Sequence, residues 1–190
     1  MNVTLLGGSS HVGKSTIARK IAEEQGGEVL STDTLARHPG RPWGEVGRRP
    51  HVIEHYLTLS VEQLLADVLR HYRENVWPQV VEAIKSAKGP LVIEGSALWP
   101  ESVATLQKEG VSAVFLTASD DLFRRRIHAE SRFDELVGTE RELVEKFLAR
   151  TLLYNERMNE AVARLGLESV NVEAFPSMAT LLAPLRKPIR

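Results

Sequence analysis

The chain has 190 residues, of which 43% are hydrophobic and 26% are charged, and this balance is that of one globular domain. The formal net charge of −1 argues against a protein that coats nucleic acid or binds a membrane surface, because such proteins carry a basic excess. The chain contains no cysteine, so its fold uses neither disulfides nor thiolate metal sites.

No part of the sequence indicates targeting or a membrane span. The first six residues carry no basic side chain and start no long apolar stretch, so no signal peptide is expected. No apolar run approaches the roughly 20 residues that cross a bilayer. We therefore expect a cytoplasmic protein that binds neither a membrane nor a nucleic acid.

The first quarter of the chain predicts two strands separated by a loop and a helix. Residues 3–6 are a short apolar run that ends at two glycines, which is typical of a buried strand. Residues 15–25 form a helical period with one apolar face, which consists of Ile17, Ala18, Ile21 and Ala22. A second strand is expected at 28–31, followed by an irregular loop at 38–50 that is rich in proline, glycine and arginine.

Two helical stretches and a third strand follow. Ser60 and Gln63 have the spacing of a capping box, which opens a helix with an apolar stripe. A second helix is expected at about 76–87 and ends before a Gly-Pro pair. The apolar run 91–93 predicts a strand that closes on Glu94.

Strands and helices also alternate in the last part of the chain. A strand is expected at 113–116, and Ser119 is placed to cap the helix that follows it. Thr139 and Glu142 have capping-box spacing and are expected to open a long helix.

A fifth strand is expected at 168–172 and a final helix at 176–185. The whole alternation predicts an α/β fold with three layers and a five-stranded, mainly parallel sheet. We expect a single domain over residues 1–190.

The loop after the first strand carries the most specific motif of the chain. It reads Gly8-Ser9-Ser10-His11-Val12-Gly13-Lys14-Ser15, with Thr16 after it, and fits the pattern G-x-x-x-x-G-K-[ST]. Glycines let such a loop curl around a phosphate chain, and the following helix adds free N–H groups and its positive end. Lys14 would then contact the β- and γ-phosphates, and Ser15 would bind Mg²⁺.

The motif therefore predicts a nucleotide site at residues 8–16 and a P-loop NTPase fold. Lys14 is also expected to act in catalysis. His11 either faces ligand or solvent or simply fills the loop.

Two carboxylates are expected at the carboxyl ends of strands, where parallel sheets gather functional groups. Asp33 follows the second strand and is predicted to orient or deprotonate an acceptor hydroxyl, or to hold Mg²⁺ together with Ser15. Glu94 closes the third strand, where it is predicted to contact substrate or a metal-bound water. Each carboxylate also has a plain alternative as a turn residue.

A run of arginines at 124–126 predicts a lid over residues 124–138. Three consecutive helical residues point in different directions, so these arginines cannot all face one ligand. Arg125 and Arg132 are our candidates for neutralising the transferred phosphoryl group. Arg150 and Arg157 share a face of the long helix, and one of them is a further candidate for the cleft.

The region 38–88 is predicted to bind the phosphoryl acceptor. The loop after Asp33 combines cations, a tryptophan and prolines. We expect the acceptor to contact Asp33, Arg37, Arg41, Trp43 and Glu94. The arginines favour an anionic acceptor, and an ordinary surface loop is the alternative.

The motif at 7–16, Asp33 after the second strand, Ile93-Glu94-Gly95 and the arginine-bearing lid resemble the nucleoside-monophosphate-kinase-like group of P-loop small-molecule kinases. Within this group the chain is similar to 2-phosphoglycerate-kinase-like proteins. It is also similar to chloramphenicol-phosphotransferase-like proteins through its Gly-Gly-Ser-Ser opening and Asp33-Thr34-Leu35.

This resemblance implies an ATP- and Mg²⁺-dependent transferase that phosphorylates a small-molecule hydroxyl, with Asp33 as the base. It also implies that adenine binds near residues 171–175. The segment between Asp33 and Glu94 matches no single acceptor class, so the acceptor stays open. The oligomeric state and the preference for ATP over GTP are not predicted from the residues.

Two other classes of protein stay under consideration. A nucleotide-binding or nucleotide-hydrolysing regulatory protein without a small-molecule acceptor would carry the same loop. The run His51-Val52-Ile53-Glu54-His55 has the spacing H-x-x-E-H of some zinc proteases. Three fixed positions are a weak pattern and no third zinc ligand is evident, so a small-molecule kinase is the preferred interpretation.

Overall fold

The computed structural model describes residues 2–36, 40–47, 49–106, 110–175, 177 and 179–181. Their strands form one parallel five-stranded sheet with the order β2-β3-β1-β4-β5. The strands are β1 (Val3–Gly8), β2 (Glu28–Ser31), β3 (Leu91–Glu94), β4 (Val111–Thr117) and β5 (Glu168–Asn171). The expected α/β fold with a five-stranded parallel sheet is therefore confirmed.

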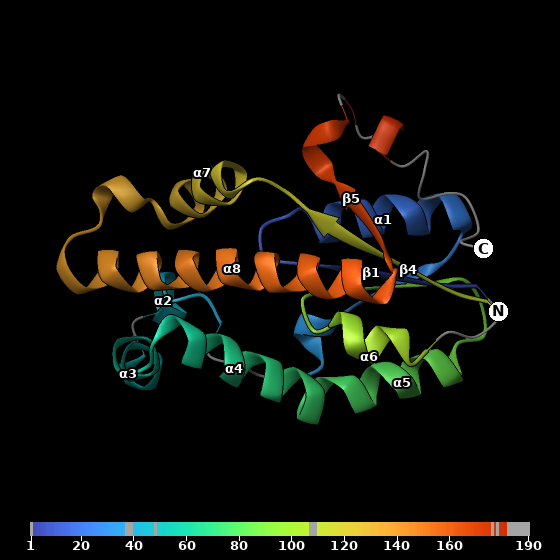
Figure 1. Ribbon diagram of the computed structural model, residues 1–190, viewed down its shortest axis with the longest axis horizontal. Coiled ribbons are helices and arrows are strands. Elements are labelled where there is room, and N and C mark those ends of the chain that lie inside the picture. Colours follow the sequence, from blue (N-terminus) through green and yellow to red (C-terminus); the bar gives the residue numbers. More distant parts are fainter. Residues whose placement is uncertain are drawn as a thin grey trace.

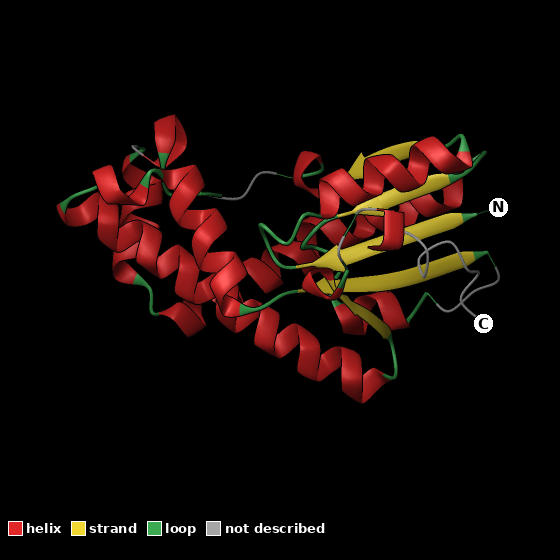
Figure 2. Ribbon diagram, turned by 90° about the horizontal axis from the view of Figure 1, so that it is seen from above, coloured by secondary structure: helices red, strands yellow, loops and turns green. Residues whose placement is uncertain are grey.

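Helices cover both faces of this sheet and extend beyond its carboxyl edge (Figure 1). They are α1 (Lys14–Gln25), α2 (Gly44–Gly47), α3 (Pro50–Thr58), α4 (Val61–His71), α5 (Trp77–Ser86), α6 (Pro100–Ala104), α7 (Asp120–Ser131) and α8 (Gly138–Leu165). In Figure 2 the arrowheads of the strands point toward the mainly helical part of the molecule.

Both faces of the sheet are buried at its centre, where every residue of β1 is buried, whereas the edge strands β2 and β5 are partly exposed. Successive strand residues point to opposite faces, so Leu6 packs into one core with α1 while Leu5 packs into the other. Helix α8 contributes to both cores, because Phe147 belongs to the first and Met158 to the second. Its buried residues include Leu143, Phe147, Thr151, Tyr154, Met158 and Val162, which recur every three or four positions.

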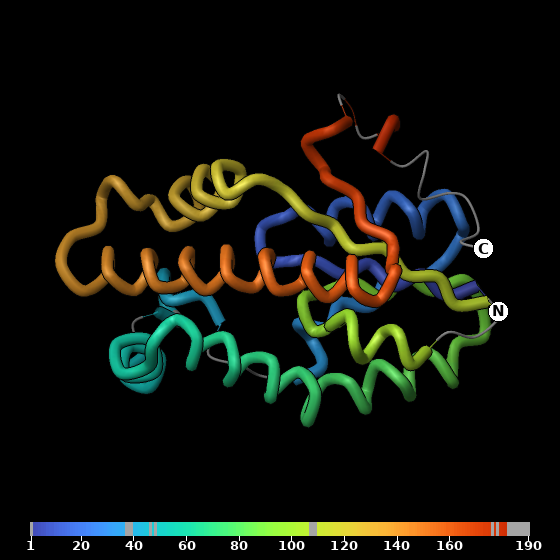
Figure 3. Tube along the Cα trace, in the orientation of Figure 1, coloured from blue at the N-terminus to red at the C-terminus, as the bar shows by residue number. Residues whose placement is uncertain are grey.

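Residues distant in sequence meet along α8. Helices α3 and α4 pack against it, and Figure 3 shows this segment running beneath its first half. Lys146 of α8 donates to the backbone carbonyls of Tyr56, Leu57 and Leu59 at 2.9–3.2 Å and so ties the end of α3 to α8. This packing holds α3 and α4 beside the carboxyl edge of the sheet.

Two predicted helix caps are present. The Ser60 side chain accepts from the Gln63 N–H, and the Gln63 side chain accepts from the Ser60 N–H, which completes the capping box of α4. Ser119 caps α7 by accepting from the Leu122 N–H. A cap of this kind stabilises a protein by about 1 kcal/mol.

The predicted cap at Thr139 is wrong. Helix α8 begins at Gly138, its N-cap is Val137, and no side chain caps it. Thr139 therefore lies inside the first turn, two residues after the N-cap position. Gly138 has φ 55°, a conformation that glycine adopts easily, and the helix starts there instead.

The loop expected at 38–50 is partly helical. It contains α2, and α3 starts at Pro50, a residue that favours the first helical position because it has no N–H to satisfy. The two helices expected after Ser60 are joined by a π-helical turn, Tyr72–Val76. Helix α6 was not expected, and most of the helix predicted at 176–185 lies outside the described residues.

Within the described residues, no helix is long and apolar enough to cross a membrane.

Candidate active site

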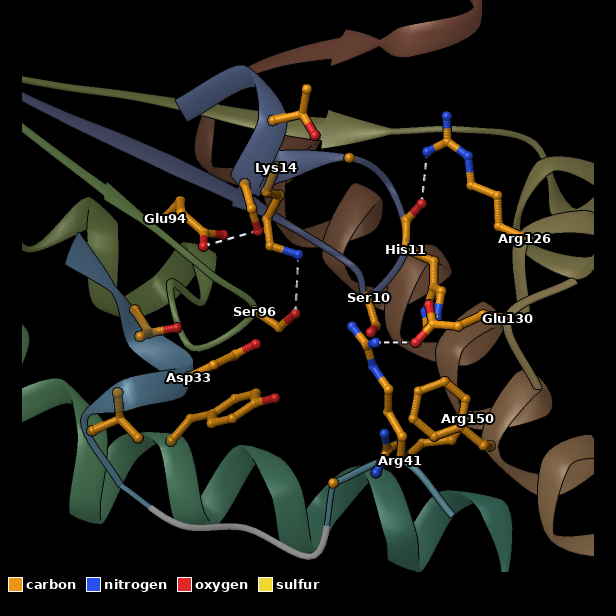
Figure 4. Close-up of a pocket in the computed structure, with 18 of the residues that line it drawn as sticks. Ser10, His11, Lys14, Asp33, Arg41, Glu94, Ser96, Arg126, Glu130 and Arg150 are labelled. Carbon is orange, nitrogen blue, oxygen red and sulfur yellow. Dashed lines mark hydrogen bonds and ion pairs between the residues drawn. The ribbon is translucent and has the colours of Figure 1, made fainter. Parts of the chain in front are cut away.

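The carboxyl ends of β1, β2 and β3 lie side by side, because Glu94 is in register with both Leu6 and Ser31. A cleft of about 830 Å³ opens at this edge of the sheet. Its main polar lining comes from Ser10, His11, Lys14, Ser15, Asp33, Arg41, Tyr72, Glu94, Ser96, Arg126, Glu130 and Arg150. Figure 4 shows those of these side chains that it labels, which come from the glycine-rich loop, the start of α1, the strand ends, the segment before α2, α7 and α8.

The glycine-rich loop (residues 8–13) connects β1 to α1. Gly8 and Gly13 have φ values of 145° and 104°, which glycine adopts far more readily than other residues. A Cβ on Gly8 would also lie 2.7 Å from the carbonyl oxygen of Leu116. The Ser9 hydroxyl donates to the carbonyl of Thr151 at 3.0 Å and anchors the loop to α8.

Lys14, the first residue of α1, exposes 8% of its surface and lies over this loop. Its ammonium donates to the Ser9 carbonyl at 2.8 Å and to the Ser96 hydroxyl at 3.4 Å. The Tyr154 hydroxyl donates to the Ser96 carbonyl at 2.6 Å and supports that contact from α8. Burial lowers the pKa of Lys14, and the carboxylates of Glu94 and Asp33 act in the opposite direction.

Three side chains whose oxygen atoms could bind a metal ion lie near Lys14. The Ser15 hydroxyl donates to Glu94 at 3.1 Å, and Glu94 is only 3% exposed. Asp33 lies in the short turn Thr32–Thr34 after β2 and exposes its carboxylate to the same cleft. Hydroxyl and carboxylate oxygens are the ligands that Mg²⁺ prefers, so these three residues fit a magnesium site.

The β2 and β3 ends approach closely at Gly95, whose φ is 152°. A Cβ on this glycine would lie 1.7 Å from the Thr32 hydroxyl oxygen. The residue after Glu94 is therefore restricted to glycine, because the turn that carries Asp33 packs directly on it.

The arginine run of α7 supplies Arg126 to the cleft. Its guanidinium donates to the His11 carbonyl at 2.7 Å. Arg125 lies near Glu173 at 3.7 Å and Arg132 near Glu135 at 3.9 Å, and neither lines the cleft. The helical period distinguishes them, because Arg126 flanks the buried face of Phe123 and Ile127 whereas Arg125 lies opposite Phe123.

His11 has φ 67° and a side chain that is 4% exposed. Its Nε2 lies 3.0 Å from a carboxylate oxygen of Glu130, and Arg41 forms an ion pair with the same carboxylate. Burial, followed by the charge of Arg41, lowers the pKa of His11 to about 4. The imidazole is therefore neutral at physiological pH.

Trp43 packs against other rings instead of lining the main cleft. Its ring lies edge-on to Phe147 at 4.8 Å between centroids and 5.8 Å from the ring of His11. Of the residues expected to contact substrate, Asp33, Arg41 and Glu94 line the cleft. Arg37 lies outside the described residues.

The wall opposite Lys14 comes from α4, the π-helical turn and α8. Tyr72 is the first residue of that turn, and burial raises its pKa to about 12. Arg150 of α8 is also buried, with 9% of its surface exposed. Ser96, Tyr72, Arg126 and Glu130 are cleft residues that sequence reasoning did not single out.

A second cavity of about 460 Å³ adjoins the cleft and shares Gly13, Thr16 and Arg126 with it. Its other walls include Val12, Ile17, Leu122, Val172, Glu173 and Phe175. It therefore lies between α1, α7 and the turn Val172–Ala174 that follows β5.

The H-x-x-E-H run lies on α3, where His51 is exposed and His55 Nε2 lies 4.0 Å from a carboxylate oxygen of Asp67. In the described part of the chain, no three His, Cys, Asp or Glu residues are grouped so that they alone could hold a metal ion. A cation in the cleft would therefore share its coordination with a ligand.

No protein-family model and no curated protein matches the chain. Solved structures do match it. Shikimate kinase from Bacteroides thetaiotaomicron is 14% identical with a TM-score of 0.56, and the match covers 97% of this chain and 94% of that one. Shikimate kinase from Aquifex aeolicus is 16% identical with a TM-score of 0.54, over 96% and 94% of the two chains.

Deoxyadenosine kinase from M. mycoides with bound dATP is 16% identical with a TM-score of 0.51, and the match covers 96% of each chain. At these identities the likeness concerns the fold. This chain therefore has the P-loop α/β fold of these kinases, as the sequence predicts.

Proposed function

We propose that the protein is a phosphotransferase that moves the γ-phosphoryl group of ATP to a hydroxyl group of a small molecule. The observation that carries the proposal is the buried Lys14 held over the glycine-rich loop, beside the bonded pair Ser15 and Glu94. The shared fold supports it, because the similar structures are kinases that act on small molecules.

In this proposal residues 8–16 bind the β- and γ-phosphates of ATP. Backbone N–H groups of the loop and of the first turn of α1 converge on the phosphate oxygens. The ammonium of Lys14 already points into the cleft, so little reorganisation accompanies binding. The second cavity is suited to the nucleotide base, since Val172 and Phe175 give it apolar walls near residues 171–175.

Magnesium would be held by Ser15 directly and by Asp33 or Glu94 directly or through water. When bound with the nucleotide, it supplies positive charge to the phosphate oxygens. Ser15 keeps its hydroxyl oriented by donating to Glu94, which leaves its lone pairs for the cation. Glu94 is buried and fixed, whereas Asp33 is exposed and faces the space left for the acceptor.

Asp33 is the proposed general base. It orients the acceptor hydroxyl and accepts its proton as the new oxygen–phosphorus bond forms. Arg126 neutralises charge on the transferred group, in the role that the sequence suggested for Arg125 and Arg132. Residues 124–138 form the proposed lid, and residues 38–88 the proposed acceptor region.

The test is a coupled assay of ADP release with Mg-ATP against a panel of small hydroxyl compounds. We expect at least one compound to stimulate ADP release strongly, and Lys14→Ala to abolish that stimulation. Lys20→Ala is the matched control, because Lys20 is an exposed residue of the same helix that pairs with Glu23. Slow hydrolysis that no compound changes would favour a nucleotide-dependent regulatory protein instead.

A further inference from the structure

Arg150 is a buried cation with unused hydrogen-bonding capacity. It lines the main cleft while 9% of its surface is exposed. Its Nη1 is fully buried and has no hydrogen-bond partner among the described residues. The ion pairs found among those residues also do not include Arg150. Buried guanidinium groups ordinarily have such partners, so this one indicates a ligand.

Two aromatic side chains contact Arg150, and one of them, Tyr56, also hydrogen-bonds with its guanidinium through the hydroxyl. Its guanidinium carbon lies 4.7 Å from the ring centre of Phe147 and 5.6 Å from that of Tyr56. Stacking of this kind engages the ring faces, whereas the N–H donors of a guanidinium lie in its plane. The Tyr56 hydroxyl itself donates to the carbonyl of Gly40 at 2.7 Å. The two side chains therefore orient the guanidinium, and its buried Nη1 still has no acceptor in the described part of the chain.

The charges around the cleft indicate that Arg150 lies near Tyr56 and Tyr72, on the side of the cleft away from Lys14. After burial, the strongest influence on the pKa values of Tyr56 and Tyr72 is the charge of Arg150. The charges that act on Lys14 are instead those of Glu94, Asp33 and Arg41. Figure 4 shows the same division, with Arg150 across the cleft from Lys14 and Glu94. Arg150 is thus separated from the place expected for the γ-phosphate.

Asp33 lines the same cleft, and its charge acts on the pKa values of both Lys14 and Tyr72. A small molecule with a hydroxyl at Asp33 can therefore extend toward Arg150 within the same cleft.

We propose that Arg150 binds a carboxylate or phosphate group of the acceptor, so that the substrate is a small anionic hydroxyl compound. This inference rests on the proposed kinase function. A planar guanidinium fits either anion through paired N–H···O bonds. In the reaction the acceptor oxygen forms a bond to the γ-phosphorus of ATP. The bond between the γ-phosphorus and the oxygen that bridges it to the β-phosphate breaks, ADP leaves, and the hydroxyl proton goes to Asp33.

An anion probe tests the site without turnover. Crystals of the wild type and of Arg150→Met are soaked in sodium selenate, and anomalous scattering locates the selenium. We expect a peak within hydrogen-bond distance of Arg150 in the wild type and none there in the variant. A peak on the glycine-rich loop in both crystals is the internal reference. Selenate on the loop with none at Arg150 in the wild type would overturn the inference.

Matched pairs of compounds test the acceptor class in the ADP-release assay. Glycerate and glycerol 3-phosphate are compared with glycerol, and longer hydroxy acids with their parent alcohols. We expect the charged member of a pair to be preferred, with a carboxylate or a phosphate ester identifying the source of the charge. Equal rates for charged and uncharged members would overturn the inference.

Arg150→Met should raise the KM for the preferred acid by about 30-fold or more, because it removes a buried charge partner. Arg150→Lys should restore part of the loss. Arg157→Met is the matched control, because Arg157 is two turns further along the same helix, exposed, and paired with Glu160 at 3.2 Å. Selenate bound at Arg150 with no stimulated ADP release would keep the anion site and reject the kinase proposal.

A melting experiment separates binding from a structural role. Methionine matches arginine in length and suits an aromatic environment, and replacing a buried ion by an apolar residue is often neutral or stabilising. We therefore expect Arg150→Met to melt at or above the wild-type temperature. A large fall in melting temperature would assign Arg150 to the core and overturn the inference.

Discussion

Helix α8 contributes two adjacent residues to the two proposed halves of the cleft, and these residues differ in whether their polar groups have hydrogen-bond partners. In the nucleotide half (residues 8–16 with Glu94 and Ser96), the Thr151 carbonyl accepts from Ser9 at 3.0 Å. In the acceptor half (Arg41, Tyr72 and Arg150), the preceding residue, Arg150, keeps a buried N–H group without a partner in the described chain. The Ser9 hydroxyl is thus bonded within the protein, whereas in our proposal the Nη1 group of Arg150 is left for a ligand.

Under the proposed function, this difference indicates how each of the two substrates would be recognised. A phosphate chain is common to many enzymes, so a loop that is already bonded in its binding shape serves it with little reorganisation. The acceptor must be distinguished from other small molecules, and buried donors that only the right ligand satisfies provide that selectivity. Changes on the two sides should therefore have different signatures.

The largest expected effect comes from Asp33→Asn, which separates the two halves most sharply. The amide keeps the shape of the side chain but cannot take the hydroxyl proton, so we expect kcat to fall by about 1,000-fold. The Kd for ATP should change little, because Lys14 and its loop keep their hydrogen bonds. Initial rates and calorimetric titration with ATP measure these two quantities.

Asp121→Asn is the control for this change, since Asp121 is exposed on α7 and does not line the cleft. Full turnover of Asp33→Asn would reject the base and leave Asp33 with a role in orientation or in the turn.

The next effect concerns stability and tests how tightly the strand ends are packed. In Gly95→Ala the new Cβ would lie 1.7 Å from the Thr32 hydroxyl and 2.8 Å from its Cβ, on a backbone with φ 152°. We expect a loss of about 3 kcal/mol in the free energy of unfolding, from strain and from displacement of the turn. Chemical denaturation measures it.

Gly89→Ala provides the matched comparison, because a Cβ there meets nothing within 4 Å. It should be neutral or slightly stabilising. Equal stability of the two variants would mean that the ends of β2 and β3 can move apart easily. The prediction that they are tightly packed at Gly95 would then be wrong.

A smaller effect is expected from the lid arginines. Arg126→Met should lower kcat by about 100-fold, because Arg126 is the arginine of the run 124–126 that lines the cleft. Arg125→Met should change kcat less than about threefold, since Arg125 faces Glu173 outside the cleft. Steady-state kinetics of both variants decide between them, and the reverse order would restore the assignment made from sequence.

The sequence predicted the features that depend on neighbouring residues. The glycine-rich loop, the strands and the Ser60 capping box are each encoded within a few positions, and all are present. The Thr139 cap failed because α8 begins at Gly138, two residues earlier than a cap at Thr139 requires. Local spacing in the sequence predicts that a helix or strand is present better than it predicts the residue at which that element begins or ends.

The way in which the cleft residues meet could not be predicted, because segments distant in the sequence build the cleft. Arg150 was a candidate from its spacing, yet its burial depends on Tyr56 and Phe147 from different helices. Ser96 follows β3 and contacts Lys14, which follows the adjacent strand β1, and no spacing in the sequence predicts this contact. The choice of Arg126 over Arg125 was open to prediction, since the apolar positions Phe123 and Ile127 define the inner face of α7.

The smallest expected effect lies where the two halves meet, at His11. Its pKa falls from an ordinary value of 6.5 to about 4, mainly through burial, although Glu130 acts in the opposite direction. As the pH falls below 6.5, the unfolded chain takes up a proton at this residue before the folded one does. The neutral imidazole therefore stabilises the fold above pH 6.5, and that contribution is lost as the pH falls toward 4.

His11→Asn isolates this contribution, because asparagine tolerates the positive φ of residue 11 and does not titrate. We expect the wild type to exceed the variant in free energy of unfolding at pH 7.5, and this excess to shrink by about 1–2 kcal/mol at pH 5. Urea denaturation at both pH values measures the excess, and the other histidines cancel in the difference. An excess that stays constant or grows would show that Glu130 keeps His11 charged, and the boundary between the halves would then be an ion pair instead of a neutral packed ring.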